Sequence, residues 1–133
     1  MSEENVELVL ESIRRFSAES LDEWAELWHP DARLYPPEGW PEPGPFIGLE
    51  AVTKEFRGAF GAWGELGFED VEVVCESRDW VVMTFRLPTR GASSGLGADF
   101  DLAAAYRIEA GLLIELVVHW DTAKALETAG LSG

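Results

Sequence analysis

Two side chains near the carboxyl end of the chain are candidates for acid/base chemistry. His119 and Asp121 stand two residues apart in a segment that alternates like a strand, so both side chains fall on one strand face. A carboxylate beside an imidazole raises the imidazole pKa toward neutrality or above, which suits a general acid or base. Each residue also has a structural alternative. Asp121 could be the N-cap of a helix over residues 122–125, and His119 could lie at a rim or in a dimer contact.

Arg86 is the second candidate for chemistry. It shares its strand parity with Val82 and Thr84, and this parity predicts a cation inside an apolar interior. A guanidinium in such a place would orient a carboxylate, a carbonyl or an enolate of a substrate. The alternative is an ion pair with an acidic side chain, because the chain has 25 acidic and only 10 basic residues.

Aromatic and small apolar residues are the candidates for a ligand-binding wall. Tyr106 could donate a hydrogen bond to a ligand oxygen or be an aromatic residue of the core. Trp40 stands in a proline-rich segment, residues 36–45, as a lid over a pocket or as a contact for a partner. Trp63 is expected to help Trp40 close the site. The other predicted ligand contacts are Phe60, Tyr35, Leu102, Ala104, Val118 and Trp120.

The charge balance restricts the classes of partner. The 133 residues carry a formal net charge of −15, while 47% of them are hydrophobic. Such a charge repels nucleic-acid phosphates and anionic lipid headgroups, and the basic residues form no patch that would offset it. We therefore expect a domain that binds neither nucleic acid nor a membrane surface. The acidic N-terminus has no secretory signal pattern, which favours a cytoplasmic location.

The cysteine and histidine content argues against a metal centre. The only cysteine is Cys75, and the two histidines, His29 and His119, are not spaced with it as zinc ligands are. We expect no metal and no other cofactor. His29 directly precedes Pro30 at a predicted helix end, where its cation would interact with the negative end of the helix dipole.

The first half of the chain has the apolar periodicity of helices. Apolar residues recur every three or four positions over residues 6–16, 20–29 and 49–63, which predicts three amphipathic helices. Pro30 is expected to end the second helix, and Gly48 precedes the third. Residues 31–35 are expected to form a short extended piece that leads into the proline-rich segment.

The period changes to two in the second half, which is typical of strands. We expect strands over residues 71–76, 80–87, 99–109 and 112–121, with a flexible connection over residues 89–98. The last two strands meet at a tight turn, Ala110-Gly111. A short helix begins at Asp121 or Thr122 and stops at Gly130. Helices followed by consecutive strands indicate an α+β fold, with N-terminal helices packed over one face of a curved, mostly antiparallel sheet.

Strand alternation assigns side chains to the two faces of this sheet. The apolar face, expected to be covered by helices, combines Phe100, Leu102, Ala104, Tyr106 and Ile108 with Ile114, Leu116, Val118 and Trp120. The opposite face, toward solvent or a dimer partner, carries Asp99, Asp101, Arg107, Glu115, His119 and Asp121.

Four passages of the sequence resemble the SnoaL-like branch of the nuclear transport factor 2-like superfamily. They are Leu27-Trp28-His29-Pro30-Asp31-Ala32, Phe46-Ile47-Gly48-Leu49-Glu50-Ala51-Val52, Tyr106-Arg107-Ile108-Glu109-Ala110-Gly111-Leu112-Leu113, and Asp121 with Ala125-Leu126-Glu127-Thr128-Ala129-Gly130-Leu131. The resemblance implies a single domain over residues 1–133 with the cone-shaped, cystatin-like fold of polyketide cyclases, ketosteroid isomerase and limonene epoxide hydrolase. It also implies a pocket for a small apolar molecule and a homodimer through the outer sheet face.

The catalytic positions of these relatives are mostly not matched. The general base of the ketosteroid isomerases would fall at Pro36, and their acidic oxyanion partner would fall near Ala103. The limonene epoxide hydrolase pattern keeps Arg86 but meets Pro88 and Val118 where it needs aspartates. The resemblance therefore implies the fold without one activity.

The expected function is the binding of a small apolar molecule. In its catalytic form, an isomerase, cyclase or hydrolase would use Arg86 to orient the substrate, Tyr106 as hydrogen-bond donor, and Asp121 with His119 for proton transfer. The alternative is a non-catalytic binding or dimerisation module of the same fold. A third hypothesis is a scaffold whose apolar sheet face pairs with a partner.

Overall fold

The fold is a single curved sheet with helices on both faces. The structure is a computed structural model that describes residues 2–17, 21–39, 44–63, 69–77, 79–87 and 100–131, without the side chains of Ser2, Ser17, Leu21, residues 57–63, Glu69, Leu87 and Phe100. Its elements are α1 (Ser2–Ser17), α2 (Leu21–Ala25), β1 (Trp28–Tyr35), β2 (Phe46–Ile47), α3 (Leu49–Trp63), β3 (Glu69–Glu76), β4 (Trp80–Leu87), β5 (Phe100–Glu109), β6 (Leu112–His119) and α4 (Thr122–Thr128).

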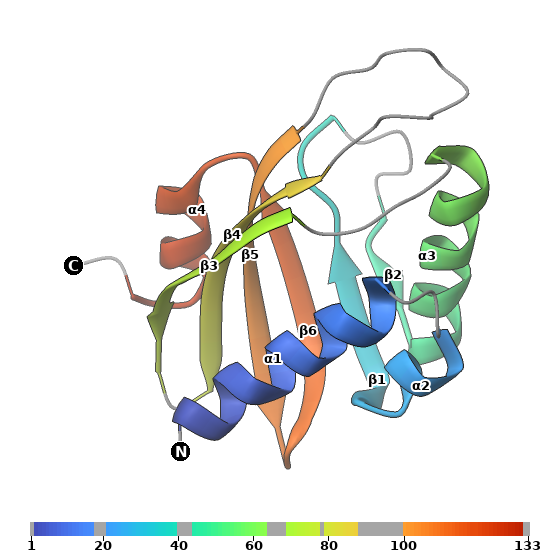
Figure 1. The fold of residues 1–133 in the computed structure, drawn as a ribbon, viewed down its shortest axis with the longest axis horizontal. Coiled ribbons are helices and arrows are strands. Elements are labelled where there is room, and N and C mark those ends of the chain that lie inside the picture. The colour runs from blue at the N-terminus through green and yellow to red at the C-terminus, as the bar shows by residue number, and fades with distance from the viewer. Residues whose placement is uncertain are drawn as a thin grey trace.

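The sheet has the strand order β2-β1-β6-β5-β4-β3. Neighbouring strands are antiparallel except β1 and β6, which are parallel. α1 crosses one face of the sheet and α2 and α3 lie on that side, whereas α4 lies against the other face (Figure 1). The predicted α+β class, with N-terminal helices over one face, is confirmed.

Two apolar clusters hold the layers together. The inner cluster joins α1, α2 and α3 to one sheet face and includes Val9, Phe16, Trp24, Val52, Met83 and Tyr106. The outer cluster joins α4 to the opposite face through Val82, Ala103, Ala105, Ala125 and Ala129. The small outer residues let α4 approach the sheet closely, while the larger inner residues fill the wider space beneath the N-terminal helices.

The prediction that the second helix reaches residue 29 is wrong. α2 ends at Ala25, and Trp28 already pairs with Leu113 of β6. Pro30 lacks an N–H, and it lies where the register between β1 and β6 shifts, so no ladder bond is lost there. The role of His29 as a helix cap is wrong for the same reason. Its Nδ1 instead accepts a hydrogen bond from the Asp31 backbone N–H at 3.0 Å.

The predicted strands and turns in the second half agree closely with the structure. β4 has the expected bounds, β3 extends the expected strand to Glu69, and β6 ends two residues early at His119. Ala110 and Gly111 have φ values of +54° and +78°, which fits a tight hairpin of the type I′ class. The short strand β2 was not expected, and the predicted connection over residues 89–98 lies outside the described residues.

A register shift in the last hairpin corrects one assignment of faces. Arg107 pairs with Glu115, but the next residue, Ile108, pairs with Leu113, so one extra residue lies in β6 at this point. Leu113 therefore takes the inner position, where it is fully buried, and the prediction that Ile114 does so is wrong.

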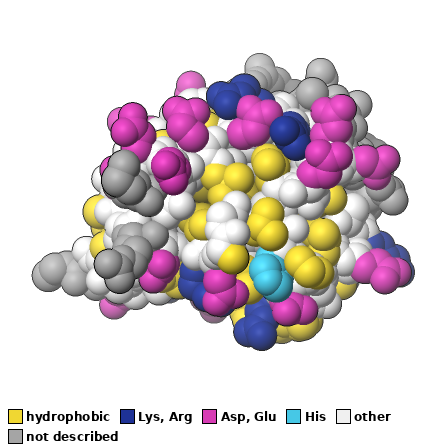
Figure 2. Space-filling view, turned by 90° about the horizontal axis from the view of Figure 1, so that it is seen from below, with side chains coloured by type: hydrophobic (Ala, Val, Ile, Leu, Met, Phe, Trp, Pro, Cys, Tyr) yellow, Lys and Arg dark blue, Asp and Glu magenta, His cyan; other side chains and the backbone are white. Residues whose placement is uncertain are grey.

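Charged side chains lie mainly on the exterior. Among the described residues, Ser12 is the only buried residue with a polar or charged side chain, apart from Tyr106 and the tryptophans Trp24 and Trp28. Viewed from below, the molecule has acidic side chains around most of the margin and hydrophobic side chains at the centre of that face (Figure 2). In the part of the chain that the structure describes, no helix is long and apolar enough to cross a membrane.

Candidate functional site

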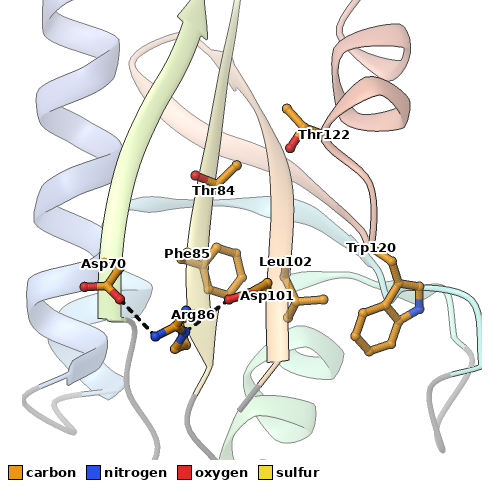
Figure 3. Close-up of a pocket in the computed structure, with 8 residues that line it drawn as sticks. All are labelled: Asp70, Thr84, Phe85, Arg86, Asp101, Leu102, Trp120 and Thr122. Atoms are coloured by element: carbon orange, nitrogen blue, oxygen red, sulfur yellow. Dashed lines mark hydrogen bonds and ion pairs between the residues drawn. The ribbon is translucent and has the colours of Figure 1, made fainter.

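Three predicted site residues line one pocket at an end of the sheet. The pocket has a volume of about 180 Å³ and lies where β3, β4 and β5 meet the connection from β6 to α4. Arg86, Leu102 and Trp120 contribute to it (Figure 3), and the other lining residues are Asp70, Thr84, Phe85, Asp101 and Thr122. The structure thus brings together part of the predicted site, although at the rim of the sheet.

Arg86 lies outside the apolar interior. Its Nε donates to Asp101 Oδ1 at 3.1 Å, and its Nη1 lies 3.5 Å from Asp70 Oδ2 (Figure 3). Its side chain is 44% exposed. The expected interior position is wrong because the inner face of β4 is formed by the alternate residues Val81, Met83 and Phe85. The alternative of an ion pair with acidic residues is what the structure contains.

Trp120 is also less enclosed than expected. Its ring is 44% exposed, because β6 ends at His119 and the chain then turns toward α4. The indole Nε1 donates to the backbone carbonyl of Glu38 at 2.7 Å. This bond ties the end of β6 to the segment that follows β1, so Trp120 stabilises the rim of the pocket.

His119 faces α4, away from the inner cluster. It pairs with Ala103, whose side chain lies in the outer cluster, and its Nε2 is 2.8 Å from Thr128 Oγ1. Burial, followed by repulsion from Lys124, lowers the pKa of His119, and the attraction of Asp121 and Glu127 does not offset these effects. Asp121 does act to raise this pKa, but the net shift is downward, so the predicted rise of the His119 pKa toward neutrality or above is wrong.

Asp121 is the N-cap of α4. Its backbone is extended, with φ −126° and ψ 126°, and its Oδ1 accepts a hydrogen bond from the Ala123 N–H at 2.7 Å. The predicted structural alternative is confirmed. His119 and Asp121 do not form a proton-transfer pair on the inner face, because both belong to the attachment of α4 to the sheet.

The inner face is lined by aromatic and apolar side chains, as predicted for Leu102, Ala104, Tyr106 and Val118. The Trp28 ring centroid lies 5.2 Å from that of Trp24 and 6.3 Å from that of Tyr106. Phe56 packs edge-on against Trp24 at 5.1 Å. We call the described inner-cluster residues of the sheet and helices the inner wall.

Tyr106 is the titratable group of the inner wall. It is 2% exposed, and burial raises its pKa above the ordinary value of 10. The hydroxyl group therefore keeps its proton at neutral pH and can donate a hydrogen bond to an oxygen atom. It is poorly suited to act as a base.

Trp28 carries a feature that the sequence pattern did not reveal. Its side chain is 3% exposed, and its Nε1 has no hydrogen-bond partner among the residues that the structure describes. The apolar spacing predicted a buried Trp28, but spacing carries no information on what an indole N–H meets in the folded chain.

The remaining predicted ligand contacts do not line the described inner face. One lies on the outer face of the sheet, and the side chains of the others lie outside the described residues. The register places Tyr35 beside Val117, whereas its neighbour Leu34 takes the inner position. The expectation that Tyr35 lines the inner face is therefore wrong. Trp40 and the side chains of Phe60 and Trp63 lie outside the described residues. Within the described ranges, no group of three or more His, Cys, Asp or Glu residues could hold a metal ion.

Comparison with solved structures identifies the fold. Bal32a, from a soil-derived mobile gene cassette, has a TM-score of 0.80 at 22% identity, with 89% of each chain covered. TerC, co-crystallised with polyporic acid, has a TM-score of 0.74 at 22% identity, over 93% of this chain and 96% of TerC. A candidate SnoaL-like polyketide cyclase from Jannaschia sp. CCS1 has a TM-score of 0.73 at 23% identity, over 99% of this chain and 94% of the other.

Likeness at such identities establishes the fold and leaves the activity open. A search of the curated proteins finds no significant match. The family model of the SnoaL-like domain matches residues 9–116, which is most of the chain. The resemblance noted in the sequence is confirmed, and the chain belongs to the SnoaL-like domain family.

Proposed function

We propose that this chain binds a small, largely apolar molecule against the inner wall. The observation that carries the proposal is the chemistry of that wall, where Ser12 is the only buried polar side chain among the described residues other than the tyrosine and tryptophans. The Ser12 hydroxyl already donates to the Val9 carbonyl at 2.6 Å. A surface of this kind favours apolar and aromatic ligands over charged ones, because nothing on it would compensate a buried charge.

The same chemistry favours binding over general acid/base catalysis. A general base must lie within hydrogen-bond reach of the proton that it removes. His119 and Asp121 lie on the α4 side, and Arg86 is held by acids at the rim. The described inner wall therefore offers hydrogen-bond donors and no general base. The described residues support a non-catalytic binding module best.

A catalytic form is the second candidate, and one observation favours it. The Tyr106 hydroxyl is buried and protonated, so it could polarise a carbonyl or stabilise an enolate of a bound substrate. The candidate polyketide cyclase among the structural neighbours supports an isomerase or cyclase of this kind, and TerC with polyporic acid supports a small organic ligand.

A matched pair of variants tests the binding site. Ala104 lies in the inner cluster and its neighbour Ala103 lies in the outer cluster, and both are buried. We expect Ala104→Leu to weaken the binding of tetralin, an uncharged bicyclic hydrocarbon, at least tenfold in calorimetric titrations. Ala103→Leu adds the same volume on the α4 side and should leave tetralin binding within about twofold of the wild type.

Circular dichroism and urea unfolding would show that both variants are folded before binding is compared. The proposal is wrong if neither tetralin nor its ketone, 1-tetralone, binds the wild-type protein. It is also wrong if the two variants weaken binding equally, because the ligand would then not distinguish the inner wall from the α4 side.

We further propose a homodimer, as the family resemblance implies. α4 covers Val82, Ala103 and Ala105 on the outer face of the sheet, so a dimer contact on that face would involve the surface that α4 leaves open. Light scattering after size exclusion would detect a particle of twice the 14.7 kDa chain mass. A particle of one chain mass at micromolar concentration would contradict the dimer.

A further inference from the structure

The Trp28 indole is a buried hydrogen-bond donor that has no acceptor in the part of the chain that the structure describes. Its side chain is 3% exposed, and its Nε1 meets no acceptor among the described residues. Trp120 differs in both respects, because its ring is 44% exposed and its Nε1 donates to the Glu38 carbonyl at 2.7 Å. A buried tryptophan N–H usually finds a partner, so the state of Trp28 requires an explanation.

The missing hydrogen bond has an energetic consequence. A buried donor without an acceptor destabilises the protein, because it has lost its bonds to water and gained none in return. The Trp28 Nε1 is sealed from solvent, so bulk water does not relieve this cost. An acceptor atom that reached the N–H would recover much of it, and this gain would add to the affinity of whatever molecule carried the atom.

The surroundings of Trp28 define which acceptor is suitable. Trp28 lies on β1 opposite Leu113 of β6, and Ile108 of β5 pairs with the same leucine. The rings of Trp24 and Tyr106 pack against the indole with centroids at 5.2 Å and 6.3 Å. The acceptor must therefore belong to a molecule that is otherwise apolar enough to lie among these side chains.

We propose that the ligand is a neutral cyclic molecule with a carbonyl or similar acceptor oxygen, and that the Trp28 N–H donates to this oxygen. This inference rests on the proposed binding function and specifies the class of ligand. A carboxylate is less suitable because the described inner wall holds no cation to compensate its charge, and an amine is less suitable because the N–H is a donor. Because the Nε1 is sealed in the free protein, binding also requires a small opening of the aromatic cluster.

The role of Tyr106 is compatible with this assignment. Burial raises its pKa, so the hydroxyl remains protonated, and its ring centroid lies 6.3 Å from that of Trp28. Two neutral donors on one apolar wall favour ketones, quinones and enols over plain hydrocarbons. A site that hydrogen-bonds a ligand oxygen discriminates against the analogue that lacks it, because the donor is then left without a partner.

The test compares two probes that differ by one oxygen, 1-tetralone and tetralin. We expect wild-type protein to bind 1-tetralone more tightly than tetralin, and Trp28→Phe to reduce this preference by about 5- to 10-fold in calorimetric titrations. Trp80→Phe is the matched control. Trp80 packs against the outer cluster, so the same substitution there should leave the preference within about twofold.

A second measurement does not depend on the folding of a variant. In the spectrum of ¹⁵N-labelled tryptophan side chains, the indole N–H signal of Trp28 should shift downfield with 1-tetralone and much less with tetralin. Loss of the signal in Trp28→Phe identifies it. Should the variant fail to fold, substitution of the other tryptophans in turn identifies the signal by elimination.

The outcomes separate this inference from the function on which it rests. If neither probe binds the wild-type protein, the proposed binding function fails and the inference fails with it. If both probes bind but the preference for 1-tetralone is absent, or survives in Trp28→Phe, the binding function stands and the assignment of Trp28 is overturned. The assignment of Trp28 would also be overturned if its indole N–H signal did not shift on addition of 1-tetralone.

Discussion

His119 and Thr128 connect the last strand to the last helix, with 2.8 Å between the imidazole Nε2 and the hydroxyl Oγ1. The contact joins the end of β6 to the final residue of α4. Since Asp121 caps the other end of α4, the two residues that suggested a catalytic pair are both used to attach one short helix. Their proximity in the sequence reflects a strand-to-helix connection.

The first prediction concerns the pH dependence of stability. The pKa of His119 is lowered from its ordinary 6.5, so the unfolded chain binds a proton more readily than the folded protein does. The native state is therefore favoured above this value and loses stability as the pH falls through 6.5 toward the lower folded pKa. We expect the urea midpoint of the wild-type protein to fall between about pH 7.5 and about pH 5.5.

His119→Gln removes the titrating group and keeps a side chain that can reach Thr128. Its urea midpoint should fall less over the same pH interval. Carboxylate titration affects both proteins alike, so only the difference between them reports on His119. Equal falls in the two proteins would contradict the lowered pKa.

The second prediction concerns the cap of α4. Asp121→Ala removes the carboxylate that accepts from the Ala123 N–H, and we expect it to lower the free energy of unfolding by about 1 kcal/mol. Asp121→Asn keeps an acceptor oxygen and should stay within a few tenths of a kcal/mol of the wild type. Urea unfolding of the three proteins measures both effects. A loss of the same size in Asp121→Asn would show that charge, and not capping, is what the residue contributes.

The third prediction concerns the charge network at the rim. Arg86 is 44% exposed, and its partners Asp70 and Asp101 are 74% and 81% exposed. Solvent screens such pairs, so Arg86→Ala should change the free energy of unfolding by less than about 1 kcal/mol. The difference should shrink further in about 1 M NaCl, where charges are screened beyond about 3 Å.

Arg86→Lys is the matched control, since it keeps the charge but not the planar guanidinium. We expect it to lie between the wild type and Arg86→Ala in urea unfolding at low salt. A loss of several kcal/mol in Arg86→Ala, insensitive to salt, would show that the arginine is a buried structural element.

The fourth prediction concerns the β5–β6 turn. Ala110 has a φ of +54°, a backbone conformation that costs about 1–2 kcal/mol for an ordinary side chain and less for asparagine. Gly111 already follows it, so Ala110→Asn creates the favoured Asn-Gly sequence of this turn class. We expect a gain of about 0.5–1 kcal/mol in the free energy of unfolding. Ala110→Val, with a branched side chain at the same φ, should be less stable than the wild type.

Local patterns were sufficient where neighbouring residues decide the structure. The presence of strands β3 and β4, the tight turn at Ala110-Gly111 and the Asp121 cap each depend on a few consecutive residues, and each prediction is confirmed. The helix predicted through Trp28 failed because a non-local partner decided that segment. The spacing of Trp28 also fits a helix, but Trp28 pairs with β6 and is therefore the first residue of β1.

The inner wall was predictable only in part. Leu102, Ala104 and Tyr106 follow from strand parity, because successive side chains point to opposite faces of a strand. Parity alone does not say which set of residues in β4 faces inward. The prediction that Arg86 lies in the interior is wrong because Met83 and Phe85 occupy it, and both sets of β4 residues contain apolar side chains that fit either face.

The sequence by itself determined the family, the α+β class and the acidic exterior, because periodicity, turn residues and charge are properties of the chain read in order. Only the tertiary structure decided that α4 covers the second face of the sheet, that His119 and Asp121 serve this helix, and that the enclosed Trp28 N–H meets no acceptor among the described residues. The physical reason is that a hydrogen bond or a buried donor depends on atoms brought together from distant segments. Such contacts form only when the strands have paired in the sheet and the helices have packed against its two faces.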